Sequence, residues 1–368
     1  MSAAQLQWTD EDRRAMSRAF ALAQRGLYTT DPNPRVGCVL LRAGQVVGEG
    51  WHERAGAAHA EPRALASAGE AARGATAYVT LEPCNHQGRT PPCTLALIEA
   101  GVSRVVYALE DPNPLVSGGG AARLRQQGIA VASGLMAAAC EELNPGYVRR
   151  MRTGMPFVRV KLAASLDGHT ALASGESRWI TSKDARKDAQ TFRARSSAIL
   201  TGVGTILADD PALNVRIAES DRQPLRVVLD SCLRTPPDAR VIDREGRVLV
   251  VAVHDDAARR KSLEVQQVEV QTLPAKDGRP DLLQVLANLG QRGINEIWVE
   301  AGPTLAGAFV TAKLFDELIV YVAPSLLGQG ALPLLDLPPL AKLEDKMALR
   351  FTDCRSVGDD LRITAVKK

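Results

Sequence analysis

Residues 77–100 read AYVTLEPCNHQGRTPPCTLALIEA. The apolar start of this stretch, residues 77–81, is typical of a strand, and residues 92–100 are typical of a helix that begins at the second of two prolines. A polar segment joins the two and contains Cys84 and Cys93. A strand followed closely by a helix is the repeating unit of α/β folds. This stretch therefore predicts an α/β domain with two cysteines between a strand and a helix.

The same alternation extends in both directions from this stretch. Thr9–Asp12 has the pattern of a helix cap, and Met16, Phe20 and Ala23 follow it at helical spacing. We expect two paired strands at residues 36–41 and 46–49, around Arg-Ala-Gly, and further strands at residues 103–109 and 129–132. Further helices are expected at residues 61–73 and 121–127. Together these elements predict an α/β sandwich with a mostly parallel sheet over residues 1–150.

Residues 144–156 interrupt the alternation with Pro, Gly and several cations, and we place a domain boundary there. A second α/β series covers residues 151–368. Its expected strands are residues 157–164, 198–200, 226–229, 248–253, 296–300 and 317–322, and its expected helices are residues 183–195, 281–292 and 304–313. Residues 254–280 are polar and carry no motif. A length of 368 residues agrees with two domains.

Composition and charge narrow the class of protein. The chain is 45% hydrophobic and 24% charged, with a net charge of +3. So small a net charge gives no reason to expect a nucleic-acid or a membrane partner. No stretch is apolar enough to span a bilayer, and the N-terminal residues lack the apolar core of a signal peptide. We therefore expect a cytoplasmic protein, in which the six cysteines are thiols or metal ligands rather than disulfides.

Four residues have the types and the placement of a catalytic zinc site. His59 and Glu61 stand at the start of an expected helix, and Cys84 and Cys93 flank the segment between the strand and the next helix. One His and two Cys ligands suit a single tetrahedral zinc ion and leave the fourth position for water. Zinc makes that water nucleophilic at neutral pH. Glu61 is two residues from His59 and is predicted to move protons between the water and a leaving group.

Two other interpretations of these residues stay open at this point. A structural zinc site would need a fourth protein ligand, for which His86 is the nearest candidate, and would leave Glu61 without a role. Alternatively, the two cysteines are unrelated buried residues. The four residues together favour the catalytic interpretation, because they resemble the H-x-E…P-C-x-x-C signature of zinc-dependent nucleobase deaminases. The chain departs from that signature by placing eight residues between its cysteines instead of two.

The longer spacing belongs to a more specific resemblance, which covers nearly the whole chain in one order. The chain is similar to the bifunctional deaminase/reductases of riboflavin biosynthesis in the segments DPNPRVGC (31–38), EPCNHQGRTPPC (82–93), DPNP (111–114), KLAASLDG (161–168), SGES (174–177), WITS (179–182), LADDPAL (207–213) and VEAGPT (299–304). The resemblance implies a cytidine-deaminase-like three-layer α/β/α domain followed by a dihydrofolate-reductase-like α/β domain.

The resemblance also implies two reactions on small-molecule pyrimidine ribotides, one zinc ion per chain, and NADPH. The 2-amino group of 2,5-diamino-6-(5-phosphoribosylamino)pyrimidin-4(3H)-one is hydrolysed, and the ribosyl group of the resulting uracil is then reduced to ribityl. In the deaminase half, Asn33 matches a substrate-contacting residue, and His52 and His86 are expected to bind the base or its ribose. Each of these three also fits an ordinary loop or surface role. A homo-oligomer, a dimer or a tetramer, is expected.

In the second half, residues 297–307 form the strongest local feature. This segment, IWVEAGPTLAG, is an apolar strand that ends in a small-residue turn and opens a helix. Free N–H groups at such a turn favour a phosphate, although Gly-Pro is also common in plain loops. The segment is not the dinucleotide fingerprint, because no G-x-G-x-x-G follows the strand. Gly202-Val-Gly204 offers a second place where the backbone can approach a ligand closely.

The resemblance assigns roles to individual residues of this half. The residues that match the NADP site are Ala163, Trp179, Thr205, Asp209, Ala301, Gly302, Pro303, Thr304, Leu305, Ala306 and Gly307. Those that match the substrate site are Lys161, Ser177, Arg193, Leu213, Arg216 and Glu300. The guanidinium groups of Arg193 and Arg216 suit a ribose phosphate, because they can donate paired hydrogen bonds to its oxygen atoms. Without the resemblance, these two arginines would be interpreted as exposed cations and Trp179 as a core residue. His169 stands where we expect Arg in the family.

Two other functions compete with that of a bifunctional deaminase/reductase. A tRNA or nucleoside deaminase with an unrelated second domain is disfavoured by the cysteine spacing and by the small net charge, since RNA enzymes usually present a basic face. A zinc-stabilised nucleotide-binding module without activity would require that the water position on the metal be blocked.

Overall fold

The structure is a computed structural model that describes residues 8–87, 91–114, 116–218, 220–242 and 245–368. The chain forms two compact units, Met1–Thr153 and Gly154–Lys368. Residue 150, where the expected first domain ends, lies within helix α6 (Pro145–Thr153). Within the described ranges, no helix is long and apolar enough to cross a membrane.

The described part of the first unit contains a five-stranded sheet with the order β2-β1-β3-β4-β5. The strands are β1 (Gly37–Arg42), β2 (Gln45–Trp51), β3 (Thr76–Leu81), β4 (Arg104–Leu109) and β5 (Ala130–Ser133). The helices are α1 (Asp10–Gln24), α2 (Ala60–Ala68), η1 (Gly69–Ala72), α3 (Cys93–Glu99), α4 (Gly119–Gln126), α5 (Ala137–Leu143) and α6. Strands β3, β4 and β5 are parallel, whereas β1 is antiparallel to both β2 and β3. The sheet is therefore mixed, and the expectation of a mostly parallel sheet holds for β3, β4 and β5 but not for the pairings of β1.

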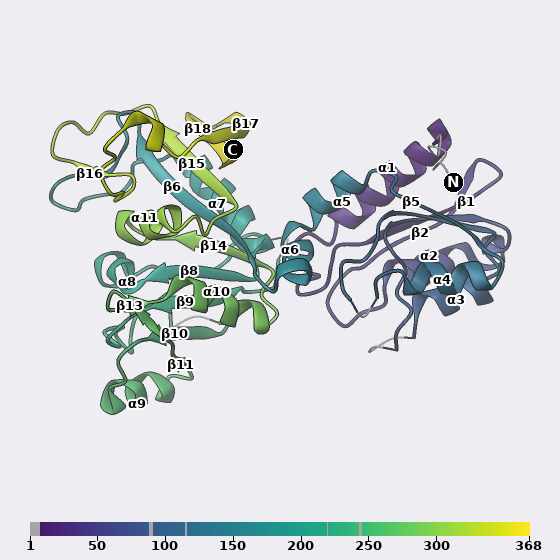
Figure 1. Cartoon of the computed structure of the whole chain (residues 1–368), viewed down its shortest axis with the longest axis horizontal. Helices are drawn as coiled ribbons and strands as arrows, with labels where there is room; N and C mark the ends of the chain where they lie inside the picture. The colour runs from purple at the N-terminus through teal and green to yellow at the C-terminus, as the bar shows by residue number, and fades with distance from the viewer. Residues whose placement is uncertain (1–7, 88–90, 115, 219, 243–244) are drawn as a thin grey trace. The chain divides into compact units, whose positions relative to one another are not determined.

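Helices cover both faces of this sheet, as Figure 1 shows. Ala64 of α2, Leu97 of α3 and Leu124 of α4 pack with apolar strand residues on one face. Met16 of α1 and Cys140 of α5 belong to a second apolar cluster, which contains the neighbouring strand residues that point the other way. This arrangement confirms the expected three-layer α/β/α architecture.

Helix α1 begins with the capping box that the sequence predicts. The Thr9 hydroxyl accepts a hydrogen bond from the Asp12 N–H at 3.0 Å, and the Asp12 carboxylate accepts one from the Thr9 N–H at 3.0 Å. We expect Thr9→Ala to lower the free energy of unfolding by about 1 kcal/mol, because a helix N–H loses its partner. Urea unfolding measures this change. A loss no larger than that of Ser17→Ala, at an exposed position within α1, would contradict the capping role.

Two helices differ from the sequence-based expectation. Residues expected to interrupt the alternation form α6, and Pro145 is tolerated because it is the first residue of that helix, where its missing N–H has no helical partner. The helix expected at residues 61–73 ends earlier, at Ala68. Gly69 follows it with a φ of +55°, a conformation that glycine adopts without strain.

The second unit contains a nine-stranded sheet among its described residues, in the order β11-β10-β9-β8-β14-β6-β15-β18-β17. The strands are β6 (Phe157–Ser165), β8 (Ala198–Gly202), β9 (Leu225–Leu229), β10 (Val248–Ala252), β11 (Glu269–Thr272), β14 (Glu296–Glu300), β15 (Glu317–Ala323), β17 (Leu349–Val357) and β18 (Asp360–Lys367). Two short ribbons pair β7 (His169–Ala171) with β16 (Leu332–Pro333), and β12 (Ala275–Lys276) with β13 (Arg279–Pro280). Neighbouring strands from β11 to β15 are parallel, and β18 is antiparallel to β15 and β17.

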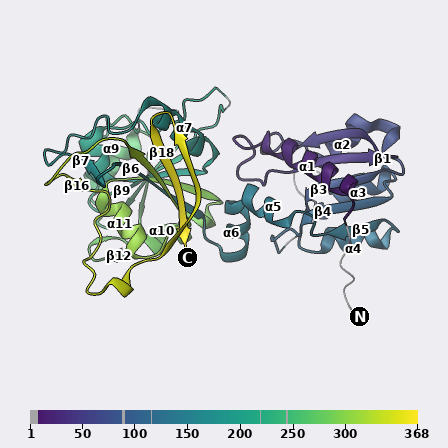
Figure 2. The same ribbon diagram turned by 90° about the horizontal axis from the view of Figure 1, so that it is seen from above.

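This sheet is also covered on both faces. Helices α10 (Leu282–Gln291) and α11 (Pro303–Thr311) pack on one face, and α7 (Lys183–Arg195), α8 (Val203–Asp209) and α9 (Ala257–Val265) pack on the other. The strands and helices that the sequence predicts here are all present. The hairpin of β17 and β18, seen in Figure 2 near the C-terminus, was not predicted. Strand β17 is exposed along most of its length, so it lacks the apolar alternation by which a strand is recognised.

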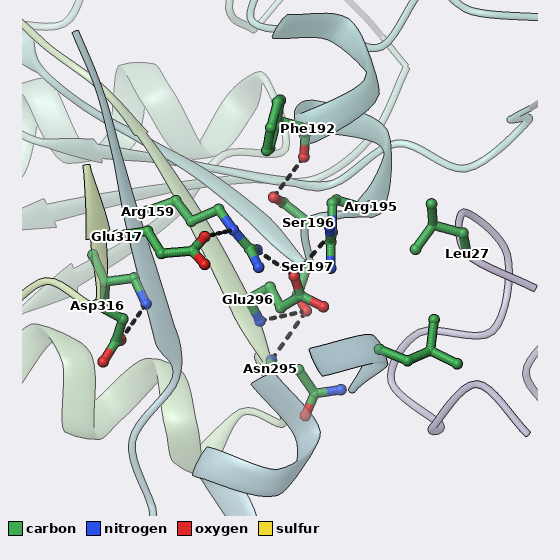
Figure 3. A network of polar contacts seen from close by, with 12 residues as sticks. Leu27, Arg159, Phe192, Arg195, Ser196, Ser197, Asn295, Glu296, Asp316 and Glu317 are labelled. Carbon is green, nitrogen blue, oxygen red and sulfur yellow. Dashed lines mark hydrogen bonds and ion pairs between the residues drawn. The ribbon is translucent and has the colours of Figure 1, made fainter. Parts of the chain in front are cut away.

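A buried ion-pair network joins three central strands of this unit (Figure 3). Arg159 of β6 forms ion pairs with Glu296 of β14 and Glu317 of β15. The side chains of Arg159 and Glu296 are each only 3% exposed. Residues two apart in a strand point to the same face, so Lys161 and Glu300, which are paired in register, lie on the same face as this network. The network thus links the two strands that carry these predicted site residues.

Candidate active sites

His59, Cys84 and Cys93 come together from three separate segments. His59 is the N-cap of α2, Cys84 follows β3, and Cys93 is the first residue of α3. The Nδ1 atom of His59 lies 3.3 Å from Cys93 Sγ and 3.7 Å from Cys84 Sγ, and the three ligand atoms lie within 4.8 Å of one another. Tetrahedral zinc, with bonds of about 2.3 Å to sulfur and about 2.0 Å to nitrogen, places such atoms roughly 3.5 Å apart. The three residues therefore fit one zinc ion with a coordination position left over.

Glu61 lies beside this cluster without being part of it. It is in the first turn of α2, two residues after His59, and is 3% exposed. Burial, together with the nearby charge of Cys84, raises the pKa of the Glu61 carboxyl group to about 7. Among the described residues, the metal-ligand cluster consists of His59, Cys84 and Cys93. The arrangement thus offers three ligands and one separate carboxyl group.

Close packing and hydrogen bonds hold this cluster in place. A Cβ atom on Gly50 of β2 would lie 2.4 Å from the Ala60 carbonyl oxygen, so only glycine lets α2 approach β2 this closely. The N-terminus of α2, which carries His59, is thereby fixed against the sheet. Hydrogen bonds from the Cys93 thiol and the Cys93 N–H, the latter at 3.4 Å, lower the pKa of the Cys84 thiol. A lowered pKa favours the thiolate form that binds metal.

Two of the three predicted substrate contacts of this half are linked to the ligand cluster, His52 by packing on His59 and Asn33 by a hydrogen bond to His52. His52 is buried, and its ring meets the His59 ring edge-on, with the ring centroids 5.4 Å apart. The Asn33 amide nitrogen donates to His52 Nε2 at 3.0 Å, which leaves Nδ1 to donate to the Ala58 carbonyl at 3.2 Å. His86 is exposed and is outside the ligand cluster. Residues 88–90 of the predicted cysteine segment lie outside the described residues.

The second unit contains a cavity of about 2130 Å³. Pockets for small ligands usually measure roughly 300–1,000 Å³, so this cavity has room for a dinucleotide together with a second ligand. The predicted site residues that line it are Lys161, Ala163, Ser177, Trp179, Arg193, Thr205, Asp209, Leu213, Arg216, Glu300, Ala301, Gly302, Pro303, Thr304 and Leu305. Segments more than 100 residues apart in the chain are thus brought to one cavity.

Glu300 is the centre of a buried charge cluster in this cavity. Arg193 donates two hydrogen bonds to its carboxylate, at 2.5 and 2.7 Å, and the Trp298 indole N–H donates a third at 2.6 Å. Burial alone would raise the pKa of Glu300, but the charges of Arg193 and Lys161 lower it to about 2. Burial lowers the pKa of Lys161, and the Glu300 carboxylate opposes that shift. The guanidinium group of Arg193 is therefore already paired with the Glu300 carboxylate. Arg216, by contrast, is exposed, and its guanidinium group donates a hydrogen bond to the Asn214 side chain at 2.8 Å.

Three singled-out residues do not line the cavity in the part of the chain that the structure describes. Ala306 and Gly307 are buried within α11, where a Cβ atom on Gly307 would lie 2.1 Å from the Asp336 carbonyl oxygen. His169, at the position where we expect Arg, is also not among the lining residues, and its Nδ1 lies 3.4 Å from Asp167 Oδ2.

The sequence analysis missed a turn that does line the cavity. Ser231 and Arg234 follow the carboxyl end of β9, next to the glycine-containing turn that begins α8. Their position directly after the apolar run at residues 226–229 was the available signal, because parallel strands end at one edge of a sheet and ligands bind there.

Two family models match the chain. The cytidine and deoxycytidylate deaminase zinc-binding region matches residues 9–109, and the RibD C-terminal domain matches residues 156–363. The first match covers His59, Glu61, Cys84 and Cys93. The second covers every predicted site residue that lines the cavity.

Proteins related over nearly their whole length share both parts. The chain is 52% identical to the riboflavin biosynthesis protein RibD of Escherichia coli (strain K12), over 95% of this chain and 98% of that protein. It is 48% identical to RibD of Haemophilus influenzae, over 99% of each chain. The solved structure of Acinetobacter baumannii RibD has a TM-score of 0.91 at 43% identity, and covers 97% of this chain and 99% of its own.

A solved diaminohydroxyphosphoribosylaminopyrimidine deaminase/5-amino-6-(5-phosphoribosylamino)uracil reductase from Thermotoga maritima has a TM-score of 0.86 at 32% identity, over 97% of this chain and 99% of its own. The resemblance seen in the sequence is thereby confirmed. The chain belongs to the RibD family of bifunctional riboflavin-biosynthesis enzymes, in which a cytidine-deaminase-like, zinc-dependent deaminase domain precedes a dihydrofolate-reductase-like, NADPH-dependent reductase domain.

Proposed function

We propose that this chain converts one pyrimidine ribotide in two consecutive steps. The first hydrolyses the 2-amino group of 2,5-diamino-6-(5-phosphoribosylamino)pyrimidin-4(3H)-one to a carbonyl and releases ammonia. The second uses NADPH to reduce the ribosyl group of 5-amino-6-(5-phosphoribosylamino)uracil to ribityl. The observation that carries the proposal is the convergence of His59, Cys84 and Cys93 beside the buried Glu61. The two activities in the name of the Thermotoga maritima relative support the same pair of reactions.

In the first step, His59, Cys84 and Cys93 hold the zinc ion. When bound, zinc supplies the Lewis acid that activates water at neutral pH. Glu61 takes a proton as water adds to the ring carbon and returns it to the amino group, so that the C–N bond breaks and ammonia leaves. His52, held by Asn33 as a neutral ring and packed edge-on against the His59 ring, is proposed to contact the base or its ribose. His86 is proposed as a further contact to the ribotide.

In the second step, the cavity of the second unit binds NADPH and the uracil ribotide together. The cofactor supplies the hydride, and the protein orients the two reacting carbons. NADPH is proposed to lie along the residues that match the NADP site, with its phosphates at the N-terminus of α11. Ala306 and Gly307 do not line the cavity, so their proposed role is to pack α11 in place rather than to contact the cofactor. Arg216, whose guanidinium is exposed, is suited to the ribose phosphate. Lys161, Ser177, Leu213, Arg193 and Glu300 complete the substrate side.

The activities are proposed to divide between the two domains, residues 1–150 for deamination and residues 151–368 for reduction. Both partners of the enzyme are small molecules, and we propose no nucleic-acid or membrane partner. A cytoplasmic location and a homo-oligomer, a dimer or a tetramer, are part of the proposal. Size-exclusion chromatography with light scattering tests the assembly state.

A coupled assay with separate readouts tests the function. We expect the zinc-loaded enzyme, given the diaminopyrimidine ribotide and NADPH, to release one ammonia for each NADPH oxidised. Ammonia is expected without NADPH, because deamination comes first, and NADPH oxidation without deamination is not expected from this substrate. Absence of ammonia release from zinc-loaded enzyme would refute the proposal.

Removal of one ligand tests the metal site. We expect Cys93→Ala to reduce bound zinc from one ion per chain to a small fraction of that, because two remaining ligands hold zinc far more weakly than three. Metal analysis after dialysis measures the content. Cys140→Ala is the matched control, since Cys140 is also buried and free but lies outside the ligand cluster, and should keep its zinc. Full zinc in both variants would contradict the assignment.

A further inference from the structure

Glu82 is a buried carboxylate of the first unit that takes no part in the proposed deamination. It directly follows β3, two residues before the metal ligand Cys84, and is only 3% exposed. A carboxylate is costly to bury unless hydrogen-bond donors of the protein replace its water. The donors around Glu82 therefore decide what this side chain does in the fold.

Three backbone N–H groups from the β4–α4 segment (residues 110–114 and 116–118) and from the start of α4 donate to this carboxylate. Its Oε2 atom accepts hydrogen bonds from the N–H of Asp111 at 3.3 Å and of Gly118 at 3.0 Å, and its Oε1 atom accepts one from the N–H of Ala121 at 3.0 Å. Gly118 is the N-cap of α4, and Ala121 is the third residue of that helix. The start of a helix leaves these N–H groups without an internal partner. The carboxylate therefore caps α4 from a distant part of the chain.

The cap of α4 corresponds group by group to the capping box of α1. In α1, Asp12 accepts a hydrogen bond from the N-cap N–H, and Thr9 accepts one from the N–H of the third helical residue. In α4 the N-cap is Gly118, which has no side chain to offer, and Glu82 accepts from both positions. Its negative charge also lies at the positive end of the helix dipole. Unlike a capping box within one helix, this cap joins α4 to the segment that carries Cys84.

Close packing places the same two segments against each other. A Cβ atom on Gly120 of α4 would lie 2.0 Å from the Pro83 carbonyl oxygen, so only glycine allows this approach. Strands β3 and β4 are parallel, and the Glu82 N–H extends their ladder by donating to the Leu109 carbonyl at 2.9 Å. The chain thus leaves both strands at the same edge of the sheet, where α/β folds bind their ligands. The β4–α4 segment therefore begins beside the segment that carries the metal ligand.

We infer that Glu82 is a positioning residue of the deaminase: by capping α4 it holds the β4–α4 segment in place beside the pyrimidine ribotide bound at the metal ligands. Glu82 acts without touching the substrate, because its carboxylate is buried and its oxygens are engaged by N–H groups. A displacement of about 1 Å in a group far from the reacting atoms can cost an enzyme roughly 100-fold. Glu61 and the three metal ligands lie outside the β4–α4 segment, so loss of the cap should weaken binding of the ribotide more than it slows the chemical step. The inference rests on the proposed deaminase function.

Glu82→Gln tests the inference in the full-length, zinc-loaded protein. Glutamine keeps the size of the side chain but replaces one accepting oxygen by an NH2 group, which cannot accept a hydrogen bond from an N–H. We expect the KM for the diaminopyrimidine ribotide to rise about 10- to 100-fold, with kcat near the wild-type value and one zinc ion per chain. Glu82→Ala removes both oxygens and should raise the KM further. In both variants, NADPH oxidation with the deaminated uracil ribotide should match the wild type, because the reductase cavity lies in the second unit.

Thr9→Ala is the matched control, because it removes the corresponding cap of α1 and leaves Glu82 unchanged. We expect urea unfolding to show destabilisation in both Thr9→Ala and Glu82→Gln, but the KM to rise only in Glu82→Gln. A wild-type KM in Glu82→Gln, or an equal rise of the KM in Thr9→Ala, would overturn the inference. Loss of zinc from Glu82→Gln would also overturn it, since Glu82 would then act on Cys84 rather than on the β4–α4 segment. If the wild-type protein released no ammonia, the proposed function itself would fail, an outcome distinguishable from a failure of Glu82 alone.

Discussion

Glu61→Gln is expected to abolish most of the deaminase activity while the protein keeps its zinc. A positioned general acid–base group contributes roughly 10²- to 10⁴-fold to a rate, and glutamine at this position keeps the shape of the side chain but cannot carry the proton. The three ligands His59, Cys84 and Cys93 are unchanged, so the zinc content should stay at one ion per chain. Ammonia release under saturating substrate, together with metal analysis, measures both quantities.

The same variant tests the independence of the two activities. The residues that line the reductase cavity all belong to the unit Gly154–Lys368, so NADPH oxidation with the already deaminated uracil ribotide should proceed at the wild-type rate. Glu70→Gln is the control, since Glu70 is an exposed carboxylate just beyond α2. Deamination near the wild-type rate in Glu61→Gln would show that another group moves the proton. Loss of both activities would show that the two sites depend on each other.

Glu300→Gln is expected to destabilise the second unit strongly. The side chains of Arg193 and Glu300 are only 12% and 15% exposed, and Lys161 adds a second buried cation beside the carboxylate. Removal of one partner from a buried ion pair costs about 3–5 kcal/mol, because the remaining charge stays desolvated without compensation. Urea unfolding, analysed as separate transitions for the two units, should show this loss in the transition of the second unit. Reduction of the ribotide should also fall, since Glu300 lines the cavity.

A surface ion pair provides the comparison for this variant. Glu269 pairs with Arg292 at 2.5 Å, but the two side chains are 42% and 25% exposed. Glu269→Gln should therefore change the free energy of unfolding by at most about 1 kcal/mol. An equally small effect of Glu300→Gln would mean that the Glu300 cluster is well solvated.

The sign of the pH dependence follows from the pKa of Glu300. Its pKa is lowered in the folded protein from 4.5 to about 2, so the stabilising contribution is complete above pH 4.5 and is lost as the pH falls towards 2. The stability difference between the wild type and Glu300→Gln should decrease over that interval.

Some elements could be predicted from the sequence because their signals are local. The bounds of α7 were predicted as residues 183–195 and are observed as Lys183–Arg195, with Ser182 as the N-cap whose side chain accepts a hydrogen bond from the Ala185 N–H. By contrast, α6 was not predicted, because a sequence does not distinguish a proline at the first position of a helix from a proline that breaks a helix. The hairpin of β17 and β18 was missed because β17 has no buried face.

The sequence by itself determined the chemistry of the zinc site and the family of the chain. His59, Glu61, Cys84 and Cys93 could be singled out because three of them stand at a helix start and Cys84 shortly after a strand, and because residue type and spacing are properties of a short segment. The tertiary structure alone decided which distant side chains meet. The pairing of Arg193 with Glu300, the approach of His52 to His59 and the placement of Arg234 in the reductase cavity depend on strand order and register. Hydrophobic periodicity shows which face of a strand is buried, but not which strand lies beside it.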